Sequence, residues 1–540
     1  MIEMTIARIA EIVGGELADI TAEEAAATRV TGTVEFDSRA VGPGGLFLAL
    51  PGARTDGHDF AAAAVASGAV AVLAARPVGV PAIVVKKPGV TGEGVDVSSG
   101  ALEFDTDGSG AAVLAALAKL AAAVAAELVA GGLTIIGVTG SSGKTSTKDL
   151  LAAVLEPLGQ VVAPPGSFNN ELGHPWTVLR ATPETDYLIL EMSARHPGNI
   201  AALAAIAPPQ IAVVLNVGTA HLGEFGSREA IAKTKAELPQ AVPASGVVIL
   251  NVDDSAVAAM AGTTAARVVR VSREPGSEVD VWAGPVALDD LARPRFTLHA
   301  GDEQVEVALA VHGDHQVGNA LCAAAVALQC GARLDQVATA LAGAGPVSRR
   351  RMQVATRADG VTVINDAYNA NPDSMRAGLK ALAWMARRSS DEPTAAPGEK
   401  RRSWAVLGEM AELGEDAITE HDAIGRFAVR LDVSRLIVVG TGRTMNAMHH
   451  GAVMEGSWGS ESTMVDDADA ALAVLQAELQ PEDVVLVKAS NSVGLGALAD
   501  ALIATDPGSP SPTAEAELPS PTAEAELPSP TAETDRSGDR

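Results

Sequence analysis

The chain contains little cysteine and little positive charge. Its 540 residues include 2 cysteines, and 39 lysines and arginines stand against 67 aspartates and glutamates, giving a net charge of −28. Cys322 and Cys330 lie in an alanine-rich helical stretch, which predicts reduced core residues of a cytoplasmic protein. The acidic balance disfavours nucleic acid as a partner, because phosphate contacts need clustered cations.

Three further patterns are missing. The first residues lack the basic-then-apolar pattern of a signal peptide. Residues 111–133 are apolar, but they are rich in alanine and include Lys119 and Glu127, so we expect a core helix and no membrane insertion. No Ser-His-Asp or Cys-His signature of a nucleophilic enzyme is visible in the sequence.

Apolar strand-like runs alternate with alanine-rich helical stretches, which indicates an α/β fold with mostly parallel sheets. The length suggests about three domains, and we place them at residues 1–110, 111–346 and 347–505. Residues 506–540 repeat a proline-rich acidic motif and are expected to be a disordered tail, inert rather than partner-binding. Residues 87–110 and 389–402 resemble inserted surface loops.

A glycine-rich loop at residues 139–145 separates an apolar strand from a helical stretch, and this is the context of a phosphate-binding loop. In such a loop backbone N–H groups approach the phosphates, Lys144 reaches the β- and γ-phosphates, and the Thr145 hydroxyl holds Mg²⁺. The strict pattern has glycine where this chain has Val138. The alternative is a glycine-rich turn with an unrelated lysine.

A polar run at residues 365–375 follows the apolar strand 361–364, and we expect Ser374 to cap the next helix. It places an aspartate, a tyrosine and three asparagines at the carboxyl end of a strand, where α/β sheets bind ligands. Ordinary turn chemistry explains the same residues.

Two other strand ends carry candidate metal ligands. Glu191 ends an apolar strand, and His221 follows the strand at residues 211–217. A carboxylate and a neutral imidazole beside Lys144 suit a divalent cation near the γ-phosphate. Taken singly, a strand-edge charge and a loop histidine explain them equally well.

These motifs, with several others, resemble the Mur ligase family of ATP-dependent ligases in order along the chain. The segments that carry the resemblance are 36–39, 43–50, 55–60, 139–145, 169–173, 191–196, 216–222, 232–237, 250–254, 313–320, 351–352, 366–375, 407–414 and 487–490. The run 368–375 resembles the branch that adds D-alanyl-D-alanine to UDP-N-acetylmuramoyl-tripeptide.

The resemblance implies a three-domain Mur ligase architecture. An N-terminal domain binds the UDP-substrate, a central P-loop domain with a parallel sheet binds ATP, and a Rossmann-like C-terminal domain completes the site. It also implies a reaction in cytoplasmic peptidoglycan precursor synthesis: the tripeptide carboxylate becomes an acyl phosphate, which the amine of D-Ala-D-Ala attacks to give UDP-MurNAc-pentapeptide. Positioning and charge neutralisation carry such a transfer.

The resemblance further implies the site residues, with Lys144, His221 and Lys235 as catalytic candidates. The residues expected to bind ATP are Thr139, Gly140, Ser141, Ser142, Gly143, Lys144, Thr145, Asn319, Arg351 and Asp366. Those expected to hold two Mg²⁺ ions are Thr145, Glu191, His221 and Lys235, the last as a carbamate. Those expected to bind the substrates are Ser38, Arg39, Asp56, His58, Asn169, Asn170, Tyr368, Asn369 and Asn371. We expect a monomer.

The chain departs from the family pattern at Ser193, where glycine is common, and at Asn491, where arginine is common. Three alternatives stay open at this stage: a sister ligase, a P-loop switch or motor NTPase, and a non-catalytic scaffold. The sequence also leaves open whether the tripeptide ends in L-lysine or diaminopimelate.

Overall fold

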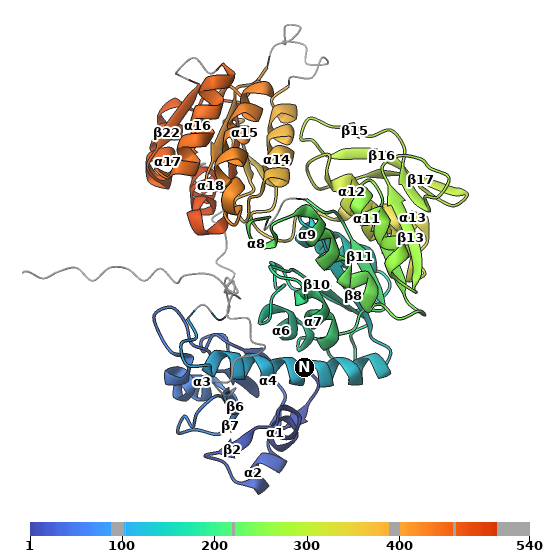
Figure 1. The fold of residues 1–540 in the computed structure, drawn as a ribbon, viewed down its shortest axis with the longest axis vertical. Coiled ribbons are helices and arrows are strands. Elements are labelled where there is room, and N and C mark those ends of the chain that lie inside the picture. Colours follow the sequence, from blue (N-terminus) through green and yellow to red (C-terminus); the bar gives the residue numbers. More distant parts are fainter. Residues whose placement is uncertain (88–101, 103, 219–221, 388–399, 457–460, 505–540) are drawn as a thin grey trace, which may run out of the picture.

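The computed structural model describes residues 1–87, 102, 104–218, 222–387, 400–456 and 461–504. The described residues form three units (Figure 1), which we call the N-terminal unit (1–87), the central unit (109–343) and the C-terminal unit (353–504). His221, the tail 506–540 and most of the two expected insertions lie outside the described residues.

The N-terminal unit is built on a five-stranded sheet of order β2-β7-β6-β5-β4, in which only the β2–β7 pair is antiparallel. A separate antiparallel pair joins β1 and β3. The elements are β1 (Met4–Thr5), α1 (Ile6–Val13), β2 (Glu16–Ala18), α2 (Ala22–Ala27), β3 (Arg29–Val30), β4 (Val34–Glu35), β5 (Gly45–Leu48), η1 (Gly57–Phe60), α3 (Ala61–Ser67), β6 (Ala69–Ala74) and β7 (Ala82–Val84).

The central unit has a ten-stranded sheet of order β15-β16-β14-β13-β12-β11-β8-β10-β9, with β17 paired to β16. Its strands from β9 to β14 are parallel, and β15 to β17 add an antiparallel extension. The strands are β8 (Thr134–Thr139), β9 (Val161–Val162), β10 (Tyr187–Glu191), β11 (Ile211–Val214), β12 (Val247–Asn251), β13 (Arg267–Ser272), β14 (Val281–Ala283), β15 (Ala287–Leu288), β16 (Pro294–Ala300) and β17 (Glu303–Ala308).

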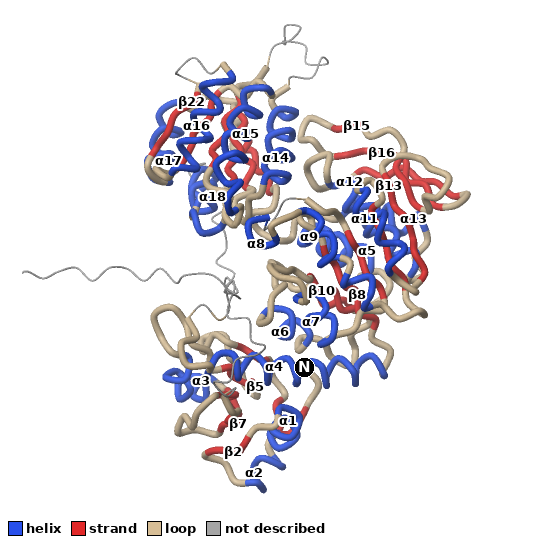
Figure 2. The backbone as a smooth tube through the Cα atoms, viewed as in Figure 1, coloured by secondary structure: helices blue, strands red, loops and turns tan. Residues whose placement is uncertain are grey.

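Helices cover both faces of this sheet (Figure 2). They are α4 (Ser109–Ala130), α5 (Lys144–Leu155), α6 (Gly173–Val178), α7 (Asn199–Ile206), α8 (Leu222–Phe225), α9 (Arg228–Lys235), α10 (Glu237–Ala241), α11 (Ser255–Ala258), η2 (Ala259–Thr263), α12 (Gln316–Gln329) and α13 (Leu334–Gly343). The pattern of parallel strands with covering helices confirms the expected α/β class.

The C-terminal unit has a six-stranded sheet of order β18-β19-β23-β20-β21-β22, parallel except for the β18–β19 pair. Its elements are β18 (Gln353–Thr356), β19 (Thr362–Asn365), α14 (Pro372–Met385), β20 (Ser403–Leu407), η3 (Gly414–Asp416), α15 (Ala417–Arg430), β21 (Arg435–Val439), α16 (Arg443–Glu455), β22 (Ser462–Val465), α17 (Ala468–Glu478), β23 (Val484–Lys488), η4 (Asn491–Val493) and α18 (Leu495–Ala504). The strand expected at 361–364 is present within one residue, as β19.

Helix α4 joins the N-terminal and central units into one core. It packs against α1, α6 and α7, and one continuous hydrophobic cluster contains Leu48 of β5, Leu117 of α4 and Leu190 of β10. Helix α4 is long and apolar enough to cross a membrane, and an 18-residue stretch of it has a mean hydropathy of 2.0. However, 56% of that stretch is buried inside the protein. This burial supports the interpretation of α4 as a core helix.

The C-terminal unit has two cores, one on each face of its sheet, and one of them also includes Ala292 of the central unit. One contains Leu379 of α14 and Leu407 of β20, and the other contains Trp404 of β20 and Leu498 of α18. Polar contacts therefore contribute much of what joins this unit to the central one, and the candidate site lies between them.

Helix α14 begins differently from the sequence prediction. Asn371, not Ser374, is its N-cap: Asn371 Oδ1 accepts the backbone N–H of Ser374 at 2.9 Å, and Ser374 Oγ accepts the N–H of Asn371 at 3.0 Å. Pro372 occupies the first turn, where its missing N–H is not needed. The expectation for Ser374 was wrong by three residues because the two side chains cap each other.

Candidate active site

The glycine-rich loop connects β8 to α5, as the sequence predicts. Gly143 has φ +85°, and a Cβ there would lie 2.7 Å from Asn319 Oδ1 on α12. The residue must therefore be glycine both for its backbone conformation and for the close approach of Asn319. The helix N-terminus at Lys144 follows directly, so the loop N–H groups and the helix dipole face the same space.

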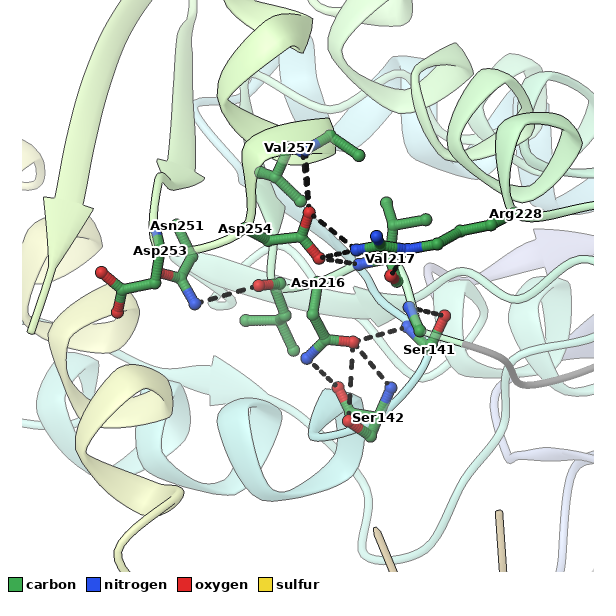
Figure 3. A network of polar contacts seen from close by, with 12 residues as sticks. Ser141, Ser142, Asn216, Val217, Arg228, Asn251, Asp253, Asp254 and Val257 are labelled. Carbon is green, nitrogen blue, oxygen red and sulfur yellow. Dashed lines mark hydrogen bonds and ion pairs between the residues drawn. The ribbon is translucent and has the colours of Figure 1, made fainter. Parts of the chain in front are cut away.

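Asn216, just past β11, holds the loop in shape (Figure 3). Its Oδ1 accepts the N–H groups of Ser141 and Ser142, each at 3.0 Å, and its Nδ2 donates to the Ser142 carbonyl at 3.2 Å. The Gly218 N–H then donates to Ser141 Oγ at 2.9 Å. Asn216 lies in the segment 216–222, which carries part of the family resemblance. An asparagine at this position does not by itself predict that it holds the loop in shape.

Lys144 and Thr145 lie beside the carboxylate of Glu191, at the end of β10. Lys144 Nζ donates to the Gly140 carbonyl at 2.8 Å, and burial lowers the pKa of this amine while the Glu191 charge opposes that shift. Thr145 Oγ1 donates to Glu191 Oε2 at 3.2 Å, and Ser167 Oγ donates to the same oxygen at 3.0 Å. Glu191 Oε1 is buried without a hydrogen-bond partner among the described residues.

Lys235 ends helix α9 and is only 7% exposed. Burial, and then the charge of Lys144, hold the pKa of the Lys235 amine well below its usual value. Two lysines that repel each other in this way lie near one another, so Lys235 belongs to the surroundings of the P-loop. A lowered pKa increases the share of the uncharged amine, which is the form able to react as a nucleophile.

Two side chains reach the P-loop, one from just before the C-terminal unit and one from within it. Arg351 Nη2 donates to Thr145 Oγ1 at 3.3 Å, and its guanidinium lies 4.2 Å from the centre of the Tyr368 ring. Asn371 Nδ2 donates to the Ser141 carbonyl at 3.4 Å. The polar run of the C-terminal unit and the glycine-rich loop of the central unit therefore meet at one place.

Asp366 is held by a buried lysine. Lys488 Nζ, at the end of β23, lies 2.6 Å from Asp366 Oδ2 and 2.9 Å from the Asn369 carbonyl. The other oxygen, Asp366 Oδ1, accepts the N–H of Met352 at 3.0 Å. The lysine thus fixes the first part of the 365–375 run.

A cavity of about 560 Å³ lies between the central and C-terminal units. Thirteen of the sequence-predicted residues line it: Ser141, Ser142, Gly143, Lys144, Thr145, Asn169, Asn170, Asn319, Arg351, Asp366, Tyr368, Asn369 and Asn371. Its size suits a nucleotide with part of a second substrate.

Other predicted residues do not line this cavity. Thr139 lies below the loop, where its Oγ1 donates to the Met192 carbonyl at 2.9 Å, and Gly140 accepts from Lys144. Glu191 and Lys235 are not lining residues either. Glu191 accepts a hydrogen bond from the lining residue Thr145, and the pKa of Lys235 is lowered by burial and then by the charge of the lining residue Lys144.

The predicted residues of the N-terminal unit lie away from the cavity. Arg39 pairs with Asp37 at 2.8 Å, and Ser38 lies between them in the chain. His58 is buried with both ring nitrogens engaged: Nδ1 lies 2.6 Å from Asp56 Oδ1, and Nε2 accepts the Ala75 N–H at 3.1 Å. The geometry gives Asp56 and His58 a role in shaping their loop, and their assignment to substrate stays a prediction.

The cavity also contains residues to which sequence reasoning gave no role. Arg195, after β10, forms an ion pair with Glu412 of the C-terminal unit at 2.7 Å, and both line the cavity with His196 and Ser490. Arg195 and His196 lie in the segment 191–196, and Glu412 lies in the segment 407–414. Because Arg195 and Glu412 are 217 positions apart, no local sequence pattern predicts their ion pair. Across the described ranges, no group of three His, Cys, Asp or Glu converges to hold a metal by itself.

Three family models match the chain. They are described as the Mur ligase family catalytic domain (residues 32–123), the Mur ligase middle domain (138–327) and the Mur ligase glutamate ligase domain (350–491). The UDP-N-acetylmuramoyl-tripeptide–D-alanyl-D-alanine ligase of Mycobacterium tuberculosis is 75% identical over 517 residues, covering 94% of this chain and 99% of that protein.

Solved structures with similar folds carry related titles. MurF from Acinetobacter baumannii superposes with a TM-score of 0.75 at 27% identity, covering 93% of this chain and 99% of that one. MurF ligase from Thermotoga maritima in complex with ADP gives 0.66 at 27% identity, covering 88% of this chain and 99% of that one.

Proposed function

The chain belongs to the Mur ligase family, and we propose that its cavity joins D-alanyl-D-alanine to UDP-N-acetylmuramoyl-tripeptide with ATP as the energy source. The relative that is 75% identical carries this activity in its name, and the chain spans 99% of its length. The protein is accordingly a MurF-type ligase of peptidoglycan precursor synthesis, with the expected three-domain Mur ligase architecture.

One observation carries the proposed site. The 365–375 run, which resembles the D-alanyl-D-alanine-adding branch, touches the P-loop directly through Asn371 and Ser141, and Arg351 reaches Thr145 from the same side. A motif for phosphates and a motif for the ligated substrate therefore share one cavity. A P-loop NTPase without an acceptor gives no reason for this pairing.

The chain's own groups act by position and charge. Backbone N–H groups of the loop, Lys144 and Arg351 neutralise the phosphates of ATP, so that a carboxylate is able to approach the γ-phosphorus. The carboxylate oxygen bonds to phosphorus as the bond to ADP breaks. The amine of the dipeptide next attacks the acyl carbon, loses a proton, and inorganic phosphate leaves with that carboxylate oxygen.

Magnesium fits the residues present. Glu191 Oε1, which has no hydrogen-bond partner within the described part of the chain, and the Thr145 hydroxyl supply hard oxygen ligands. Mg²⁺ commonly binds one or two carboxylates together with substrate phosphates. We assign Thr145 and Glu191 to the ion that neutralises the γ-phosphate charge. His221 lies outside the described residues, and its part in a second ion stays a prediction.

A carbamate fits Lys235. The uncharged form of its amine is able to add carbon dioxide and lose a proton. The resulting carbamate is an anion that attracts Lys144, whereas the protonated amine repels it. The carbamate then supplies a further oxygen ligand to the ions or orients Lys144. The unmodified lysine offers neither.

Asn169 and Asn170 line the cavity on the side of the central unit, and we assign them to the UDP-substrate. Tyr368 and Asn369 line it from the C-terminal unit, and we assign them to the dipeptide side. We propose that the chain acts as a monomer. A cytoplasmic location is part of the proposal, because the proposed substrate is linked to a nucleotide.

Phosphate release tests the proposal. The purified chain with ATP and Mg²⁺ is given UDP-MurNAc-tripeptide, with and without D-Ala-D-Ala, and the product is identified by mass spectrometry. Turnover that needs both substrates and yields UDP-MurNAc-pentapeptide is the expected result. Release that is indifferent to the dipeptide indicates an NTPase, and no release under any condition indicates a scaffold.

A further inference from the structure

The segment between α13 and β18, residues 344–352, is the covalent link between the central and C-terminal units. It ends beside the cavity, because Arg351 is both part of this linker and a lining residue. The path of the linker therefore decides where the Arg351 guanidinium lies relative to Thr145.

The linker is tied to the P-loop helix at Ser348. The Ser348 N–H and Oγ donate to the two oxygens of Asp149 on α5, each at 3.0 Å, and Ser348 Oγ accepts the N–H of Gly166 at 3.1 Å. Ser348 is 2% exposed, and the Asp149 side chain is 12% exposed. Lys148 completes the network, since its Nζ lies 3.1 Å from Asp149 Oδ1 and donates to the Gly166 carbonyl at 3.0 Å.

Hydrogen bonds, rather than tight packing, hold the linker here. A small cavity of about 20 Å³ lies between the linker and α5, lined by Asp149, Ser348 and Gln316 among others. A packed core would resist displacement by itself, whereas a segment over a void depends on its polar contacts.

The backbone after the anchor is strained. Arg350 and Met352 have φ +58° and +48°, a conformation that residues with side chains rarely adopt. Both are held by the C-terminal unit, Arg350 through Asp500 at 2.9 Å and Met352 through Asp366 at 3.0 Å. Such strain persists where the surroundings fix a conformation that function requires.

We propose that Ser348 and Asp149 are positioning residues, which fix the linker to the P-loop helix so that Arg351 stays at the phosphate end of the cavity. Arg351 lies three positions after Ser348, a reach of about 10 Å, so a shift at Ser348 passes directly to the guanidinium. The inference rests on the proposed function, because it takes Arg351 to act on the nucleotide. Ser348 and Asp149 act through Arg351 and need not touch the reactants.

The test compares Ser348→Ala with Ser403→Ala. Ser403 is equally buried, at 2% exposure, and exchanges hydrogen bonds with Ser434 at 3.0 and 3.1 Å, but it lies away from the cavity on β20. Both variants should lose similar thermal stability. Only Ser348→Ala is expected to lower kcat for ligation, by about tenfold, because small misplacements at a reacting centre have large effects. Equal kcat in the two variants would overturn the proposal.

A second comparison asks whether the effect passes through Arg351. In an Arg351→Ala background, Ser348→Ala should lower kcat no further, and Asp149→Asn should behave in the same way. If Ser348→Ala lowered kcat by the same factor with and without Arg351, the anchor would act by another route, and this would overturn the inference.

Failure of the proposed function has a different outcome, since the wild-type chain would then form no pentapeptide. The affinity for a non-hydrolysable ATP analogue then provides the readout. A several-fold loss of affinity for the analogue in Ser348→Ala, absent when Arg351 is already alanine, supports the proposed role of the anchor. Unchanged affinity in Ser348→Ala overturns it.

Discussion

Replacing Lys488 with methionine should strongly destabilise the C-terminal unit. The Lys488 ammonium makes short contacts to Asp366 Oδ2 at 2.6 Å and to the Asn369 carbonyl at 2.9 Å, and its side chain is only 2% exposed. Methionine fills a similar volume but leaves the Asp366 carboxylate buried without its counter-charge. Removing one partner of such a pair typically costs about 3–5 kcal/mol.

The expected loss translates into a melting shift. At ~2–4 °C per kcal/mol for a unit of this size, Lys488→Met should lower the C-terminal transition by about 6–20 °C in scanning calorimetry of the full chain. Lys400→Met is the matched control, because Lys400 pairs with Asp432 at the surface, where an ion pair contributes only about 0–1 kcal/mol.

A double variant separates charge from packing. Asp366→Asn combined with Lys488→Met removes the stranded carboxylate, so part of the lost stability should return. A Lys488→Met protein that melts as late as Lys400→Met would refute the reasoning, because Asp366 would then have another source of compensation.

Three further outcomes follow from the site. Gly143→Ala should raise the KM for ATP about tenfold or more. The left-handed backbone conformation costs alanine ~1–2 kcal/mol, and the added Cβ would collide with Asn319. An unchanged KM in a folded variant would contradict this. Bicarbonate labelled with ¹³C should give a carbamate NMR signal in the wild-type chain that Lys235→Arg lacks. The signal should fade as the pH falls through the lowered pKa of Lys235, because the amine then takes up a proton. A signal shared by both proteins would contradict the carbamate. Small-angle scattering should show compaction with both substrates and an ATP analogue, because separate cores and polar contacts leave the C-terminal unit able to close; unchanged dimensions would argue against closure.

The fold and the centre of the site were accessible from the sequence because their signals are local. Strand, glycine-rich loop and helix at residues 133–155 form one continuous pattern, and the C-terminal strands β19, β20, β21 and β23 are short apolar runs. The cap of α14 was misplaced because Asn371 and Ser374 are both good capping residues at the spacing of a reciprocal pair.

The remaining contacts depend on partners far apart in the chain. The Arg195–Glu412 ion pair and the hydrogen bonds from Ser348 to Asp149 cross between units, and no local pattern marks them. The two ring nitrogens of His58 contact Asp56 and Ala75, which the sequence did not indicate, and its part in substrate binding stays a prediction.

The fate of one oxygen atom tests the central claim most directly. UDP-MurNAc-tripeptide labelled with ¹⁸O in its terminal carboxylate is turned over with ATP, Mg²⁺ and D-Ala-D-Ala, and the released phosphate is analysed by mass spectrometry. Activation as an acyl phosphate predicts one ¹⁸O atom in each phosphate and the pentapeptide as product. Unlabelled phosphate would mean that ATP is hydrolysed by water, and it would contradict the ligase mechanism.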